Sequence, residues 1–255
     1  MSQPVAHEAI ILRTRAYGES DLIVTFLTDV AGKLTGIAKG AKNSRRRFPN
    51  CLHPLSRVRA HYRQRPQATL VFLESCDLVR PATTFSEPRK LAYGQYLLEL
   101  VDVLSEEAHP IPEQFHLLDR ALSVLLQGPA TATFLRAFEL QLLCLAGYEP
   151  QFTLCKGCGQ PIEAQEVALF AFDLARPLCP ACGLSGGSDA VRVAAATLSA
   201  LERLKSISLS EAQRNDLLQA SRTEAADIVA RLLSPHLRRP LASLELIAQL
   251  GRADS

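Results

Sequence analysis

Apolar and polar residues alternate, or apolar residues form short β-branched runs, through the first 80 residues of the chain. This pattern is typical of β-strands, because successive side chains of a strand point to opposite faces. A turn at Gly32 predicts that the second and third runs pair as a hairpin. The pattern predicts a small β-barrel of five short strands, at residues 7–14, 22–28, 33–39, 56–63 and 68–75.

The fourth run shows the alternation most clearly. Val58, Ala60 and Tyr62 alternate with basic residues. Period 2 places the apolar set in the core and the other set on one exposed face. That exposed set is Arg57, Arg59, His61 and Arg63.

From residue 88 onward the hydrophobic period changes from 2 to 3.6, which indicates amphipathic helices. The third helix is expected to end at Gly147, followed by Pro150. We interpret the helices as a core bundle, with some apolar surface left to dock a partner. Their markers are Leu97, Val101 and Leu104; Leu118, Leu122 and Leu125; Phe134, Phe138 and Leu142; Leu198, Leu201 and Leu204; and the stretch 221–233.

Charge is distributed unevenly along the chain. The 255 residues carry a net charge of +2, but residues 1–80 hold 13 Lys and Arg against 6 Asp and Glu, a net +7. Residues 81–255 hold 15 against 20, a net −5. This asymmetry predicts a nucleic acid or another polyanion as the partner of the first 80 residues.

A basic loop, AKGAKNSRRRFPN, lies between the third and fourth predicted strands. Lys and Arg near phosphates release condensed counterions, so the loop and the basic strand face are candidates for a nucleic-acid backbone site. Phe48 either stacks on a base or packs into the barrel, and the loop itself could be only a solvated, charged surface. The candidate DNA-binding residues are Lys33, Lys39, Lys42, Arg45, Arg46, Arg47, Arg57, Arg59 and Arg63.

Four of the seven cysteines form two C-x-x-C pairs, Cys155 with Cys158 and Cys179 with Cys182. The first residues do not resemble a secretory signal and no run is long enough to span a membrane, so a reducing cytoplasm is expected, where such pairs favour metal over disulfides. The spacing predicts one tetrahedral Zn²⁺, held by four thiolates that leave no open catalytic position. The segment VALFAF between the pairs could form one strand of a hairpin. The other three, Cys51, Cys76 and Cys144, are interpreted as small hydrophobes.

Signatures of catalysis are missing from the sequence. It has no phosphate-binding G-x-x-x-x-G-K-[ST], no H-E-x-x-H and no His-x-Glu of the zinc deaminases. We therefore expect a binding protein and not an enzyme.

Three segments together resemble the RecO family of bacterial DNA repair proteins. They are EAIILRTRAYGESDLIVTFLTDVAGKLTGIAKGAKNSRRRF, LQLLCLAGYEPQFTLCKGCG and HLRRPLASLELI, and they include G-E-S-D, G-K, K-G-A and A-G-Y-x-P elements. The resemblance covers about residues 5–250, in the order of the family. It implies an OB-fold, a helical domain with a zinc-binding insert, and a recombination mediator.

The resemblance also implies partners and a location. The partners are single- and double-stranded DNA, whose complementary strands the family anneals, and RecR, with which it places RecA on DNA coated by single-stranded DNA-binding protein. No membrane is implied, and the location is cytoplasmic, at the nucleoid. The alternative is a zinc-containing, non-enzymatic protein-interaction adaptor in transcription or translation.

The expected fold is therefore α+β and multidomain. It has an N-terminal OB-fold β-barrel at residues 1–80 and an all-helical domain at 81–255, into which a four-cysteine zinc site is inserted at about 151–190.

Overall fold

The computed structural model of the protein describes residues 4–64, 70–164, 166–183, 190–219 and 221–253. The chain forms two compact units. The first contains residues 1–127 and 240–255, and the second contains residues 128–239. The predicted domain boundary at residue 80 and the predicted limits of the insert stay predictions.

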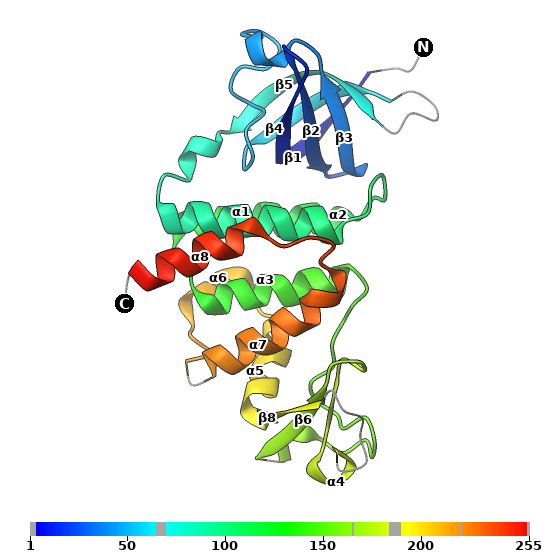
Figure 1. Ribbon diagram of the computed structural model, residues 1–255, viewed down its shortest axis with the longest axis vertical. Coiled ribbons are helices and arrows are strands. Elements are labelled where there is room, and N and C mark those ends of the chain that lie inside the picture. Colours follow the sequence, from blue (N-terminus) through cyan, green and yellow to red (C-terminus); the bar gives the residue numbers. More distant parts are fainter. Residues whose placement is uncertain (1–3, 65–69, 165, 184–189, 220, 254–255) are drawn as a thin grey trace. The chain divides into compact units, whose positions relative to one another are not determined.

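The first unit begins with a closed barrel of five strands (Figure 1). The strands close in the order β1-β2-β3-β5-β4, with β3 parallel to β5 and the other neighbours antiparallel. This is the five-stranded OB-fold barrel, so the predicted architecture is confirmed. The strands are β1 (Val5–Tyr17), β2 (Asp21–Thr28), β3 (Gly32–Ala38), β4 (Arg57–Arg63) and β5 (Val71–Arg80).

The strand predictions are correct in number and order, with β1 and β5 longer than expected. Positions 68 and 69 of the fifth predicted strand lie outside the described residues. Val58, Ala60 and Tyr62 are at most 1% exposed, which confirms the predicted inward face of β4. Phe48 lies in the same apolar cluster and is 5% exposed, so it packs into the barrel.

The barrel is followed by a 3-10 turn η2 (Ala82–Thr84) and by helices α1 (Pro88–Leu104) and α2 (Pro112–Gln127). These are the first two helices that the periodicity predicts. Helix α8 (Ala242–Ala253) returns to the same unit and packs against α1, as Figure 1 shows. Ser243, in the first turn of α8, donates its backbone N–H and its hydroxyl to Glu99 of α1, at 3.1 and 2.6 Å. This first turn is thus capped by a residue from another helix.

The second unit combines helices with a small sheet. Three strands pair in the order β7-β6-β8. The first five residues of VALFAF form β6 of a β6–β7 hairpin, as predicted. The remaining elements include three helices that the periodicity predicted (α3, α5 and α7) and three elements that it missed (α4, α6 and β8). Their bounds are α3 (Ala132–Leu145), η3 (Ile162–Ala164), β6 (Val167–Ala171), β7 (Arg176–Leu178), α4 (Pro180–Gly183), β8 (Ala190–Ala194), α5 (Ala195–Leu204), α6 (Leu209–Arg214), α7 (Arg222–Leu233) and η4 (Ser234–His236).

Helix α3 ends as the sequence predicts. Gly147 takes a left-handed conformation with φ of 83°. Its N–H bonds the carbonyl of Cys144, and the N–H of Tyr148 bonds the carbonyl of Leu143. These two bonds form a Schellman motif, which a glycine at this position permits without strain. Within the described part of the chain, none of the helices is long and apolar enough to cross a membrane.

Candidate nucleic-acid interface and metal centre

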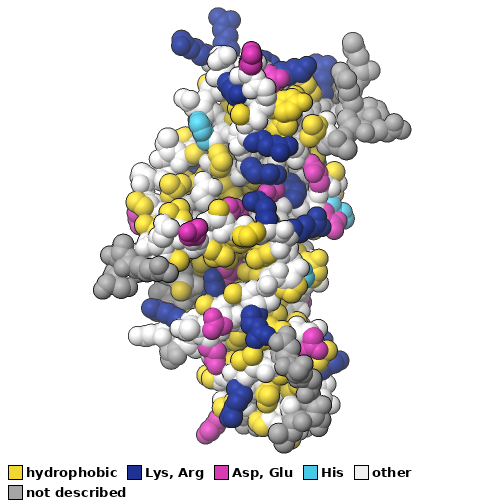
Figure 2. Space-filling model, in the orientation of Figure 1, with side chains coloured by type: hydrophobic (Ala, Val, Ile, Leu, Met, Phe, Trp, Pro, Cys, Tyr) yellow, Lys and Arg dark blue, Asp and Glu magenta, His cyan; other side chains and the backbone are white. Residues whose placement is uncertain are grey.

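The basic loop, residues 39–50, connects β3 to β4 through a 3-10 turn η1 (Ala41–Asn43). Its five cations are all exposed: Lys39, Lys42, Arg45, Arg46 and Arg47. Figure 2 shows Lys and Arg side chains gathered over the top of the barrel. The loop therefore brings five positive charges into one exposed segment, as the sequence predicts.

Two of these five cations support the loop itself. Lys42 donates its ammonium to the carbonyls of Gly18 and Glu19, at 2.8 and 3.1 Å. Arg47 donates to the carbonyl of Lys39 at 2.7 Å. The side chains of the other three make no hydrogen bond or ion pair with any described residue, and we call them the outward cations: Lys39, Arg45 and Arg46.

The predicted basic face of β4 carries acidic partners. Arg57 pairs with Glu8 at 3.4 Å and with Asp119 of α2 at 2.8 Å. Arg63 pairs with Glu74 at 2.6 Å. Arg59 makes no ion pair among the described residues, but its neighbours across the strands are Glu8 and Asp77. Because these acids offset the arginines, the β4 face is less positive than its sequence suggests.

Lys33 lies away from the basic loop, at the junction of the barrel with α1. Its side chain is 13% exposed and its ammonium donates to the backbone carbonyl of Asp102 at 2.5 Å. The Asp102 carboxylate lies 3.7 Å away and also pairs with Arg13. Burial lowers the pKa of Lys33, while Asp102 and Glu107 act in the opposite direction. The ammonium of Lys33 is therefore engaged by Asp102 and does not stand free for a phosphate.

A groove with a volume of about 850 Å³ runs beside the basic loop. Its walls include Thr14, Leu22, Asn43, Arg45 and His53. The ring of Phe48 also borders it, but the burial of this ring rules out the sequence hypothesis that Phe48 stands free to stack on a base. Thr14 donates its hydroxyl to the carbonyl of Leu52 at 2.6 Å, which holds the segment just after the loop against β1.

The four predicted metal ligands come together in the second unit. The sulfur atoms of Cys155, Cys158, Cys179 and Cys182 all lie within 4.8 Å of one another. Those of Cys158 and Cys179 are 3.8 Å apart. Four sulfurs at about 2.3 Å from a tetrahedral zinc would be about 3.8 Å apart, so the cluster fits such an ion.

Local backbone structure shapes this cluster. A side chain at Gly157 would place its Cβ only 2.8 Å from the Cys182 sulfur, so glycine lets the two halves approach. The backbone N–H of Cys179 donates to the Cys155 sulfur at 3.2 Å. Burial favours a high pKa for Cys155, but N–H groups of Cys158, Cys179 and Gly157 outweigh it and lower the pKa to about 6. These N–H groups thus favour a thiolate at Cys155, and the four cysteines could together hold a zinc ion with no open position.

The three other cysteines lie elsewhere. Cys51 and Cys76 are buried in the barrel core, as expected of small hydrophobes, and Cys144 is half-buried in α3.

Comparisons with known proteins agree for both ends of the chain. The family model "Recombination protein O N terminal" matches residues 1–82, and "Recombination protein O C terminal" matches residues 86–245. Three relatives are each named DNA repair protein RecO. The relative from Anaeromyxobacter sp. (strain Fw109-5) is 35% identical over 98% of each chain. The one from Myxococcus xanthus (strain DK1622) is 36% identical over 96% of this chain and 97% of the relative, and that from Syntrophus aciditrophicus (strain SB) is 31% identical over 96% and 95%. With its barrel, its helices and its four-cysteine cluster in place, the chain belongs to the RecO family.

Proposed function

We propose that this chain is a non-enzymatic mediator of DNA repair and homologous recombination. It binds single- and double-stranded DNA, anneals complementary strands and, together with RecR, helps to load RecA onto DNA coated by single-stranded DNA-binding protein. It acts in the cytoplasm, at the nucleoid. The names of its relatives support the repair role, and the three outward cations of the basic loop are the observation that carries the DNA contact.

Annealing requires no bond chemistry from the protein. Each DNA strand carries closely spaced negative charges, and two strands must approach against their mutual repulsion. Lys39, Arg45 and Arg46 are exposed, and none of them forms an ion pair with an acidic side chain in the part of the chain that the structure describes. A strand held on these charges is partly neutralised, so a second strand can approach it more easily.

The metal has a structural role in this proposal. We infer that Cys155, Cys158, Cys179 and Cys182 hold one Zn²⁺, which closes the loops that carry the two pairs. A zinc ion would supply cross-linking of these loops, and the four cysteines would fill its coordination shell.

A protein-interaction adaptor in transcription or translation is not favoured, because both family models describe recombination proteins. A strand-annealing assay separates the two functions. The purified chain should accelerate the pairing of complementary oligonucleotides, whereas an adaptor should leave the pairing rate unchanged.

The double variant Arg45→Ala/Arg46→Ala should bind DNA more weakly at all sequences. Two lost phosphate contacts should flatten the log–log dependence of duplex affinity on salt by about two units, or by about 1.4 units on a single strand. Fluorescence anisotropy of labelled oligonucleotides over a series of salt concentrations measures this slope.

The matched control is Arg203→Ala/Arg214→Ala, which removes the same charge from exposed positions on α5 and α6. This control should keep the wild-type slope. An unchanged slope in the loop variant, or an equal loss in both variants, would refute the assignment of the interface to the basic loop.

A further inference from the structure

The tight turn between β1 and β2 is tied to the start of the basic loop by the carboxylate of Asp21. Asp21 Oδ1 accepts a hydrogen bond from the backbone N–H of Gly40 at 2.8 Å. The same atom accepts from the hydroxyl of Ser20 at 3.1 Å. The bond to Gly40 joins residues that are 19 positions apart in the sequence.

Lys42, in the loop, also donates hydrogen bonds to the turn between β1 and β2. Its backbone N–H donates to the carbonyl of Ser20 at 3.0 Å, and its ammonium donates to the carbonyls of Gly18 and Glu19. Turn and loop are thus linked in both directions. The hydrogen bond from Gly40 is the main cause of the lowered pKa of Asp21. Burial opposes this shift, and Ser20, Lys39 and Lys42 each lower the pKa further by a smaller amount.

Gly40 stands where the chain leaves β3 and enters the basic loop. Its φ of 63° lies in the left-handed region, which turns the chain sharply just before η1. Arg47 donates to the carbonyl of Lys39, the residue before this turn. Gly40 therefore sets the direction in which the loop leaves the barrel, and Gly40 is also the residue that Asp21 bonds.

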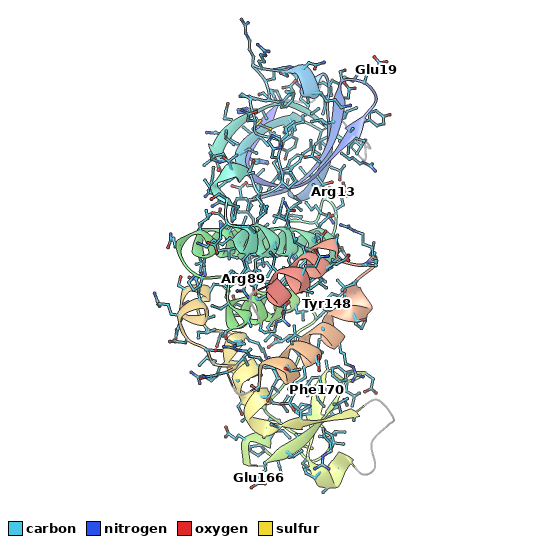
Figure 3. All side chains as sticks on the ribbon, turned by 60° about the vertical axis from the view of Figure 1, so that its left-hand side comes forward. Arg13, Glu19, Arg89, Tyr148, Glu166 and Phe170 are labelled. Atoms are coloured by element: carbon cyan, nitrogen blue, oxygen red, sulfur yellow. The ribbon has the colours of Figure 1, made fainter. Side chains whose placement is uncertain are left out.

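The turn and the loop lie at the end of the barrel opposite to α1. In Figure 3, Glu19 marks this end, and Arg13, which pairs with Asp102 of α1, marks the other. A substitution of Asp21 is therefore made at the opposite end of the barrel from its junction with α1.

We propose that Asp21 is a positioning residue, whose bond to Gly40 orients the basic loop so that Lys39, Arg45 and Arg46 face a DNA backbone together. This inference rests on the proposed function, since it concerns the orientation of the same interface. It assigns to an acidic residue a favourable effect on the binding of a polyanion.

Electrostatics alone predicts the opposite effect. A negative charge beside the basic loop repels phosphates, so its removal should tighten DNA binding. If Asp21 orients the loop, its removal should instead loosen the loop and weaken binding. The sign of the change therefore separates the two accounts.

Four variants test the sign. Asp21→Ala should bind a labelled single-stranded oligonucleotide about fivefold more weakly at about 0.1 M salt, with a salt slope lower by about one unit. Asp21→Asn keeps an acceptor oxygen without the charge and should restore affinity to within about twofold of wild type. Asp21→Glu keeps the charge but displaces the acceptor, so it should bind about threefold more weakly. Glu19→Ala removes an exposed carboxylate from the same turn and should bind equally or more tightly.

Hydrogen exchange provides a readout that does not depend on DNA. The amide of Gly40 should lose protection in Asp21→Ala and Asp21→Glu, while the amides of β4 and β5 keep theirs. If Asp21→Ala fails to fold, Asp21→Glu and Asp21→Asn still test the inference, because they differ in the acceptor position and in the charge.

The inference is overturned if Asp21→Ala or Asp21→Glu binds DNA as tightly as Glu19→Ala, or if Asp21→Asn loses as much affinity as Asp21→Ala. Either result leaves the proposed function intact as long as Arg45→Ala/Arg46→Ala flattens the salt slope. If that double variant keeps the wild-type slope, the interface itself is wrong, whatever the Asp21 variants do.

Discussion

Replacing Cys158 with serine should abolish stoichiometric metal binding and destabilise the second unit. The wild-type chain should carry about one zinc ion, because its four sulfurs are already within tetrahedral reach of one another. Structural zinc sites contribute about 10–16 kcal/mol of apparent binding free energy in small zinc-finger peptides, and much of this is folding free energy. We expect the melting temperature of the unit to fall by more than about 5 °C, as followed by circular dichroism, with metal content measured by mass spectrometry.

Cys144→Ser is the matched control, because it removes a thiol from α3 outside the cluster. It should keep one zinc ion per chain, and a chelator should lower its melting temperature as it does that of the wild type. Full metal content in Cys158→Ser would contradict the ligand assignment. A metal-free chain with unchanged stability would contradict the structural role.

Replacing Asp119 with alanine should lower the free energy of unfolding of the first unit by about 2 kcal/mol. Asp119 on α2 pairs with Arg57 at 2.8 Å and with Arg80 at 3.5 Å, and thus links α2 to both β4 and β5. Burial lowers the pKa of Arg80, and the negative charge of Asp119 acts against this decrease. Removing one partner of a buried ion pair costs about 3–5 kcal/mol, and we reduce this figure because these side chains are 16–30% exposed. The midpoint of urea unfolding measures the change.

Arg120→Ala provides the comparison, since Arg120 is the exposed neighbour of Asp119 on the same helix. Its unfolding midpoint should stay close to wild type, because isolated surface changes are usually worth less than about 0.5 kcal/mol. Equal midpoints for Asp119→Ala and the wild type would show that the two arginines do not depend on Asp119.

The barrel could be predicted from the sequence because the pattern that identifies each strand lies within the residues of that strand. Period 2 in 56–63 identified Val58, Ala60 and Tyr62 as core residues, and all three are buried. The metal cluster is local in the same sense, because each pair of cysteines is separated by two residues and the β6–β7 hairpin brings the pairs together. These parts follow from spacing along the chain alone.

Long-range partners could not be predicted. Nothing near Arg57 in the sequence indicates Asp119, which lies 62 positions later, and nothing near Lys33 indicates Asp102. Helix α8 was missed for a related reason, because Glu99 of α1 supplies the cap of its first turn. Asp21 was noticed only as part of the G-E-S-D element, since its bond to Gly40 forms only once β2 and β3 pair.

The barrel's charges show the functional consequence of these partners. From the sequence, nine cations were equal candidates for DNA contact. In the structure, Lys33, Arg57 and Arg63 face acids. Lys42 bonds a backbone carbonyl of the turn between β1 and β2, and Arg47 bonds the carbonyl of Lys39 within the loop. The candidate interface thus narrows to the outward cations, with Arg59 beside two acidic neighbours.

A crosslinking map tests the central claim, that the basic loop contacts DNA, most directly. The full chain would be bound to a single-stranded oligonucleotide that carries a photoreactive group, irradiated, digested and analysed by mass spectrometry. We expect crosslinks within residues 39–50, and we expect them to decline in Arg45→Ala/Arg46→Ala but not in Arg203→Ala/Arg214→Ala. Crosslinks confined to residues 128–239, with none in the basic loop, would contradict the claim.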